Sequence, residues 1–437
     1  MAETFLITGT ISALPKSPIK SKPIAPARIA AFDILSQVAA GNGNSDDLLY
    51  SAATAKLSSE DRNLATALVL GTLRWQIALD ARIQSQLQRP DQRLAEPVAI
   101  ALRLGAFQLL HLDRIPPHAA INESVELTRF GGHPHAAGMV NAILRKLIGA
   151  KLPGQSIHEN AAAIARRLAH PQWMVERWIS QYGRADAIKI CEADQVEPAE
   201  PVLFNDSSDT NLPRIDDGSR LVAELAAAAA PQVRLVWDAC AAPGGKTLIL
   251  AHRLPQAEIL ATDVSSRRLA AMRTRLASYS YTAKIQMEVV DASAPADSKQ
   301  HFDLILADVP CSGTGTLARN PEIRLRLEPD GLIRHVGRQR KILRSALSRL
   351  ALGGRLIYST CSLESEECEQ VVEAVLAEPE FASCVRLLPL APWIDSLSAG
   401  GLLKKPLNGV VRGNALRTLP GVHSGDGFFA ALMERIC

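Results

Sequence analysis

A glycine-rich turn that ends in a lysine is the stretch of this sequence whose residue types point most directly to chemistry. Residues 238–247 read Asp-Ala-Cys-Ala-Ala-Pro-Gly-Gly-Lys-Thr, between an apolar run at 233–237 and a segment of helical length at 247–254. Glycines let a backbone approach a ligand closely, and a helix N-terminus offers unpaired N–H groups and a partial positive charge. The pattern predicts a strand, a tight turn and a helix, with a ligand at the turn.

Acidic residues follow the next three strand-like runs. Asp263 comes 25 residues after Asp238, close to the spacing of about 20 at which a carboxylate meets ribose hydroxyls in a nucleotide-binding fold. Ligands of open α/β sheets bind beyond the carboxyl ends of the strands. We therefore predict a nucleoside-type ligand in a Rossmann-like sheet, against the alternative of a plain strand-to-helix turn. The aspartates that end these runs are Asp263, Asp291 and Asp308.

A phosphate-binding loop is the second interpretation of the same turn. Gly245-Lys246-Thr247 fits the end of that motif, but Cys240 stands where its first glycine is required. A nucleoside triphosphatase is thus the less favoured hypothesis, and an absence of ATP binding would remove it.

Two cysteines follow strand-like runs, in polar loops. Cys311 lies in the glycine-rich stretch 309–315 directly after Asp308, and Cys361 follows the apolar run 355–360. Both thiols are therefore expected at the same rim of the sheet, beside the nucleoside pocket. The alternative is that both are small buried apolar residues, which predicts cysteines inside strands rather than at their ends.

Composition excludes several classes of protein. The 437 residues carry 48 basic and 45 acidic side chains, so the net charge of +3 does not by itself indicate a nucleic-acid-binding protein. No apolar run approaches the roughly 20 residues of a membrane span. The seven cysteines are odd in number and include no C-x-x-C pair, so we expect neither a disulfide framework nor a metal site. A reducing cytoplasm is the expected location. Three of the cysteines show no visible chemistry: Cys368, Cys384 and Cys437.

The chain divides by pattern into four parts. Residues 1–25 predict a disordered tail, 26–150 an all-helical bundle, 151–217 a helical connector and linker, and 218–437 an α/β domain. By itself the bundle could be a scaffold, a partner-binding module or an RNA-binding module. A monomer is the favoured state.

One basic segment lies inside the α/β region. Residues 324–350 contain seven arginines and one lysine against two acidic residues, within a helix expected over 329–351 and ended by Gly353-Gly354. A surface that faces phosphate and an ordinary solvated helix face are both consistent with this charge. An acidic helix is expected at 364–378, then a polar loop to about 420 and a closing strand at 428–433.

These motifs resemble the bacterial rRNA small-subunit cytosine-5 methyltransferase B family (Sun/Fmu type). The stretch 238–246 looks like its S-adenosylmethionine motif, and 308–313 and 359–362 look like its two cysteine motifs. The two thiols make the match specific, because most other methyltransferases have neither. The segment between Pro201 and Gly218 is shorter than in most members. Four N-terminal stretches look like the family's NusB-like domain, and two further stretches also match: 71–75, 108–116, 122–123 and 140–145; 170–173 and 426–429.

The resemblance implies a fold and an activity. We expect an N-terminal NusB-like helical bundle, which would bind RNA, and a C-terminal Rossmann-like domain of class I S-adenosylmethionine-dependent methyltransferases. The implied reaction is methylation of carbon 5 of cytosine in RNA, through a covalent bond between a thiolate and carbon 6. Small-subunit (16S) rRNA is the favoured substrate. The target base must be single-stranded or flipped out.

Residue roles follow from the resemblance. Cys361 would be the nucleophile, Cys311 would help release the product, and Asp308 would contact the cytosine or the cofactor. Lys246 would lower the pKa of a thiol or touch the base. Asp263 would accept bonds from the ribose, and Asp291 from the adenine amino group. The residues expected to wrap the methionine end of S-adenosylmethionine are Cys240, Ala241, Ala242, Pro243, Gly244, Gly245 and Lys246.

Two further hypotheses compete with this function. Relatives of such enzymes act on tRNA or on other rRNA positions. A protein of another class, an RNA-binding assembly factor with an inactive α/β domain, would use only the helical bundle. Binding of labelled cofactor would separate it from an enzyme.

Overall fold

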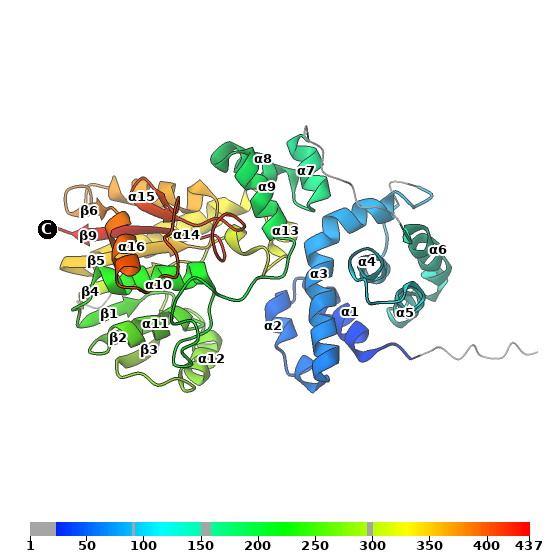
Figure 1. Ribbon diagram of the computed structural model, residues 1–437, viewed down its shortest axis with the longest axis horizontal. Helices are drawn as coiled ribbons and strands as arrows, with labels where there is room; N and C mark the ends of the chain where they lie inside the picture. Colours follow the sequence, from blue (N-terminus) through cyan, green and yellow to red (C-terminus); the bar gives the residue numbers. More distant parts are fainter. Residues whose placement is uncertain (1–22, 90–91, 150–158, 295–299) are drawn as a thin grey trace, which may run out of the picture.

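The computed structural model describes residues 23–89, 92–149, 159–294 and 300–437. The tail predicted at 1–25 therefore lies almost entirely outside the described residues, and so does the start of the helix expected at 157–168. Figure 1 shows an α/β part and a helical bundle at opposite ends of the molecule, with helices α7, α8 and α9 between them.

The N-terminal region is a helical bundle, as predicted. Its apolar core draws on every long helix, including Phe32, Leu68, Leu104 and Leu144. The Ser58 side chain accepts a hydrogen bond from the Asp61 N–H and so caps the longest helix. The helices are α1 (Pro26–Ala39), α2 (Ser45–Leu49), α3 (Ser59–Gln84), α4 (Glu96–His111), α5 (Pro117–Phe130) and α6 (Ala137–Leu147).

Four further helices lead into the α/β part. Helices α7 (Ala161–Arg167), α8 (Gln172–Tyr182) and α9 (Arg184–Ala193) share a core with Leu317 and Leu363, which follow the two cysteine motifs. Helix α10 (Asp217–Ala229) is alanine-rich and almost wholly buried, because its small side chains pack flat on the sheet.

A single sheet organises the α/β part. Within the described residues it has nine strands in the order β3-β2-β1-β4-β5-β9-β8-β7, with β6 also paired to β9. Strands β1 to β5 run parallel, and β9 is antiparallel to β5. The strands are β1 (Leu235–Asp238), β2 (Glu258–Asp263), β3 (Lys284–Val289), β4 (Phe302–Asp308), β5 (Leu350–Thr360), β6 (Val385–Leu388), β7 (Val411–Arg412), β8 (Ala415–Arg417) and β9 (Phe429–Arg435).

Helices cover both faces of this sheet (Figure 1). One face packs on α10, α11 (Gly245–Arg253) and α16 (Ala391–Ala399), and the other on α14 (Gly331–Ser348) and α15 (Glu369–Leu376). Helix α12 (Ser266–Leu276) packs beside β2 and β3. This is the predicted Rossmann-like architecture. Strand order reverses between β1 and β4, so the ligand crevice of such a sheet is expected at their carboxyl ends.

Two local predictions were wrong. The helix expected over 329–351 ends at Ser348, and Gly353-Gly354 lie inside β5, where the pairing with β4 shifts register. Gly353 has a positive φ of 72°. A β-bulge and a helix end can both require this left-handed backbone conformation, so the same glycine pattern fits either. The loop expected up to residue 420 contains β6, α16, β7 and β8, whose strands are too short to show alternation.

The expectation of no disulfide was also wrong for one pair. Cys384 and Cys437 are bonded to each other. They flank β6 and β9, which pair antiparallel through Val385 and Arg435, so the two ends of the chain segment meet. Such a pairing depends on strand register and could not be predicted from cysteine spacing.

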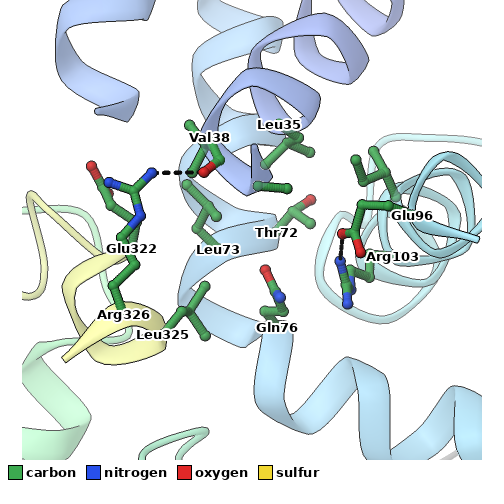
Figure 2. A pocket seen from close by; sticks show the side chains of 12 residues that line it. Leu35, Val38, Thr72, Leu73, Gln76, Glu96, Arg103, Glu322, Leu325 and Arg326 are labelled. Carbon is green, nitrogen blue, oxygen red and sulfur yellow. Dashed lines mark hydrogen bonds and ion pairs between the residues drawn. The ribbon is translucent and has the colours of Figure 1, made fainter. Parts of the chain in front are cut away.

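The helical bundle contacts the α/β part through the segment directly after the Cys311 loop. Glu322 accepts hydrogen bonds from the Ser45 N–H (2.9 Å) and hydroxyl (2.8 Å) at the start of α2. Arg326, in the short helix α13 (Ile323–Arg326), donates to the Val38 carbonyl at 2.7 Å across a hollow of about 250 Å³ (Figure 2). Arg74 in turn donates to the Ala318 carbonyl. The bundle is therefore bonded to the segment that directly follows the Cys311 loop.

Candidate active site

The two cysteines predicted at one rim of the sheet lie side by side. The Sγ atoms of Cys311 and Cys361 are 3.2 Å apart, although 50 residues separate them. Strands β4 and β5 are parallel neighbours with Asp308 opposite Ser359, so each chain leaves the sheet at the same level. Both thiols are partly exposed, as a site that meets a large substrate requires.

One buried carboxylate connects the two cysteine loops. Glu367 is fully buried and accepts hydrogen bonds from the Ser312 N–H at 2.8 Å and the Ser362 hydroxyl at 2.6 Å. It also accepts bonds from the Ser312 hydroxyl and from Gln339 Nε2 at 3.0 Å. Ser312 and Ser362 are the residues that follow the cysteines, so this side chain binds both loops one residue from each thiol.

A lysine and an aspartate stand beside the thiols. Lys246 Nζ donates to Asp308 at 2.8 Å and to the Ser219 hydroxyl at 2.8 Å, and it lies 5.0 Å from the Phe428 ring centre. The other oxygen of Asp308 accepts a bond from the Ser359 hydroxyl at 2.7 Å. Burial lowers the pKa of Lys246, but the negative charges of Asp308 and then Cys361 outweigh it, so the net shift is upward. The ammonium group is therefore charged and close to both.

The surroundings of the Cys311 thiol favour its protonated form. The pKa of the Cys311 thiol is raised well above its ordinary value, first by its hydrogen bond to Cys361, then by burial, and further by the charges of Cys361 and Glu367. Cys311 therefore keeps its proton, and its sulfur lies within hydrogen-bonding distance of the Cys361 sulfur.

The glycine-rich turn is fixed by a residue at the end of the strand before it. Asp238 is buried at the end of β1 and accepts a hydrogen bond from Thr247 at 2.6 Å, which fixes the start of α11. Burial raises the pKa of Asp238 to about 7. Gly244 has a φ of 91°, and a Cβ there would lie 2.7 Å from Met272 and Leu276. The turn can therefore be made only with glycine, and its backbone faces the carboxyl ends of the strands.

The predicted cofactor aspartates lie around this turn. Asp263 is buried and accepts bonds from the Ser265 N–H at 2.9 Å and from Arg268 at 2.8 Å. Asp291 is exposed, and bonds from Ser293 lower its pKa. Carboxylate acceptors at three strand ends suit a ligand with ribose hydroxyls, an amino group and a cationic sulfur. These residues fit S-adenosylmethionine.

Sequence reasoning missed several residues that contact the predicted ones. Arg268 reaches from Asp263 to the Ala242 carbonyl and so spans the turn. Ser219 and Ser359 hold Lys246 and Asp308. Glu367 lies in the acidic run 364–369, at the start of the segment for which the sequence predicted only an acidic helix. No signal in a single sequence separates a buried glutamate from exposed neighbours.

Gly315 offers a local test of how closely the loops are packed. Its N–H donates to the Cys361 carbonyl at 2.9 Å, and a Cβ there would stand 2.2 Å from the Gly427 carbonyl oxygen. We expect Gly315→Ala to lower the free energy of unfolding by about 1–3 kcal/mol, the range for overpacked sites, and to lower activity by moving the Cys361 backbone. Thermal denaturation checks the first effect.

Gly337→Ala is the matched control for that substitution. Gly337 lies within α14 with nothing within 4 Å of its added Cβ, so alanine should raise stability by about 0.5–1 kcal/mol. Equal melting temperatures for the two variants would contradict the packing described here.

Both parts of the chain match known protein families. Residues 227–434 match the family described as 16S rRNA methyltransferase RsmB/F, and residues 25–149 match the NusB family. A ribosomal RNA small subunit methyltransferase B of Xanthomonas campestris is 30% identical, over 93% of this chain and 96% of the relative. A probable ribosomal RNA small subunit methyltransferase B of Bacillus subtilis is 28% identical, over 87% and 92%.

A solved structure supports the fold as a whole. The crystal structure of PH0851 superposes with a TM-score of 0.67 at 20% identity, covering 95% of this chain and all of that one. Fold, site and matches together define an S-adenosylmethionine-dependent methyltransferase with an N-terminal NusB-like bundle. The chain belongs to the ribosomal RNA small subunit methyltransferase B family, as its motifs predicted.

The described residues contain neither a membrane-spanning helix nor a cluster of metal ligands. No helix there combines the length and apolar character that a membrane crossing needs. No group of three or more potential metal ligands was found among the same residues.

Proposed function

We propose that this protein methylates carbon 5 of a cytosine in small-subunit (16S) rRNA, through a covalent bond between Cys361 and carbon 6. The observation that carries the proposal is the 3.2 Å separation of the Cys311 and Cys361 sulfurs beside an ion-paired lysine. The relatives' names supply the rRNA substrate. Bisulfite sequencing of cellular RNA from a deletion strain tests it: one rRNA cytosine should lose its protection.

The first step needs a thiolate. Carbon 5 of cytosine is a weak nucleophile, and addition of sulfur at carbon 6 places electron density on carbon 5. Cys361 is suited to this addition because the charged Lys246 is near it and the Cys311 sulfur lies within hydrogen-bonding distance of its own. S-adenosylmethionine, when bound, supplies an electrophilic methyl group.

The release step needs a base at carbon 5. Once Cys361 has become a thioether, the hydrogen bond and the negative charge by which Cys361 raises the pKa of Cys311 are lost or weakened. Cys311 can then lose its proton to solvent, and its thiolate can remove the proton from carbon 5. The carbon 6–sulfur bond breaks as the ring double bond forms again, which returns Cys361 as a thiolate.

Other residues position the reactants. We assign the turn 240–246 to the methionine end of the cofactor, Asp263 to the ribose and Asp291 to the adenine amino group. Asp308, fixed between Lys246 and Ser359, offers its carboxylate to the cytosine edge or the cofactor. The remaining alternatives are a tRNA or another rRNA cytosine, and the inactive assembly factor. Cofactor binding to the whole chain excludes the last.

The same proposal extends to the parts of the chain. We propose that 26–150 forms the RNA-binding bundle, 151–217 a connector and 218–437 the catalytic domain, in a cytoplasmic monomer. The contacts of Glu322 and Arg326 with the bundle support a bundle that positions RNA relative to the Cys311 loop.

Several cations of the basic segment predicted at 324–350 are engaged within the protein, which narrows where RNA can bind. Arg324 is buried against backbone carbonyls, Arg344 pairs with Glu378, and Arg349 stacks on Trp237. Three exposed cations remain in a row along α14, and one of them lines a hollow that includes Ser312, the residue after Cys311. They are Arg334, Arg338 and Lys341. We propose that this row contacts the RNA backbone.

Changing the row to glutamine should weaken RNA binding through charge alone. Each phosphate contact to a single strand contributes about 0.7 to the slope of log affinity against log salt. The triple variant Arg334→Gln, Arg338→Gln, Lys341→Gln should therefore lower that slope by about two, with kcat changed little. Filter binding of rRNA over a salt series measures it. Arg344→Gln, on the same helix but paired with Glu378, is the control; an equal slope in both variants would contradict this surface.

A further inference from the structure

Glu367 is a buried carboxylate that is held by hydrogen bonds rather than by an ion pair. It is fully buried, and none of the ion pairs found among the described residues involves it. A buried carboxylate costs several kcal/mol unless hydrogen bonds compensate for lost water. Here four donors do so, two from Ser312, one from Ser362 and one from Gln339.

These donors come from three different elements of the α/β part. Ser312 follows β4, Ser362 follows β5, and Gln339 lies in α14, which covers the adjoining face. Each carboxylate oxygen receives two bonds, and one oxygen binds both serine hydroxyls, which are themselves 3.2 Å apart. The distance between the loops is thus fixed by a rigid planar group one residue from each sulfur.

We infer that Glu367 is a positioning residue that sets the separation of the Cys311 and Cys361 thiols by binding Ser312 and Ser362 together. This inference depends on the proposed covalent mechanism. Glu367 touches neither thiol and acts through the two serines. An apolar residue of similar size would fill the same space, but it would remove the hydrogen bonds that join Ser312 and Ser362 through one carboxylate.

A second effect follows from its charge. The Glu367 carboxylate is one of the groups that raise the pKa of Cys311. The charged and titratable groups around Cys311 include Cys361 on the neighbouring loop, Glu367, Tyr358 within β5 and the Lys246–Asp308 ion pair. A carboxylate here therefore helps keep the proton on Cys311 until Cys361 has reacted.

Glu367→Gln tests the inference, because glutamine keeps the shape but turns one acceptor into a donor that faces other donors. A displacement of about 1 Å at reacting groups costs up to roughly a hundredfold in rate. We expect kcat to fall about tenfold to a hundredfold, with KM for rRNA and cofactor affinity within twofold. The limb of the pH–rate profile that reports Cys311 should move to lower pH, since a negative charge is gone.

Glu364→Gln is the matched control. Glu364 is also fully buried and lies three residues earlier, but its carboxylate binds Arg177 and Trp178 of α8, away from the thiols. Its loss should destabilise the fold while kcat and the pH profile stay near those of the wild-type protein. Equal losses of kcat in both variants with unmoved pH profiles would mean that Glu367 is merely structural and would overturn the inference.

Smaller changes keep the test decisive if Glu367→Gln does not fold. Ser312→Ala and Ser362→Ala each remove one hydroxyl donor, and each should lower kcat about threefold to tenfold, with less than additive effects when combined because both act through one carboxylate. Unchanged kcat in both would overturn the inference. If the wild-type protein itself forms no 5-methylcytosine, the proposed function fails; if it does and only these variants behave as wild type, the inference alone fails.

Discussion

Cys361→Ala is expected to abolish methylation of small-subunit rRNA, with a loss of at least about 10⁴-fold in kcat. Without the sulfur, nothing at the site can add to carbon 6, and carbon 5 stays too weak a nucleophile to accept a methyl group. The Lys246–Asp308 ion pair at 2.8 Å does not involve this side chain, so cofactor binding should persist. Transfer of labelled methyl groups measures the loss, and calorimetry measures cofactor affinity.

A buried cysteine far from the thiol pair controls for general damage. Cys191 is fully buried in the core shared by α7, α8 and α9. Cys191→Ala should lower stability modestly and leave methylation intact. Full activity in Cys361→Ala would contradict its assignment as nucleophile.

Cys311→Ala is expected to trap the enzyme on its substrate. The Cys361 thiolate can still add to carbon 6 and the methyl group can still be accepted, but the proton on carbon 5 has no base to remove it. Turnover should fall about 10²- to 10⁴-fold, the usual contribution of a positioned base. A protein–RNA band that survives denaturing electrophoresis should accumulate with one methyl group per chain.

The double variant separates this explanation from nonspecific crosslinking. Cys311→Ala combined with Cys361→Ala should form no stable band, because the attachment atom is gone. Repeated turnover by Cys311→Ala without any adduct would assign the release step to another group.

The sequence was most informative where chemistry and strand order coincide. Each of the aspartates at 238, 263 and 308 ends a strand in the structure, because an apolar run that stops at a charged residue marks the edge of a buried sheet. Parallel neighbours place their carboxyl ends together, which is why thiols 50 residues apart could be predicted to meet.

Features that depend on register or on pairing across the chain could not be predicted. The four short elements between residues 385 and 417 have too few residues for a pattern, and the Cys384–Cys437 bond follows from antiparallel pairing at the end of the chain. The charge of 324–350 gave no way to tell Arg324, which is buried, from Arg334, which is exposed. Glu367 was hidden for the same reason, since burial is decided by tertiary packing.

Trapping on fluorinated RNA tests the central claim most directly. In 16S rRNA transcribed with 5-fluorocytidine, carbon 5 of the target carries fluorine, which cannot leave as a proton does, so the adduct should persist on the wild-type protein. Mass spectrometry of the digested complex should find a methylated fluorocytidine attached to the peptide that contains Cys361. Attachment to any other residue, or methylated RNA without a covalent complex, would contradict the mechanism.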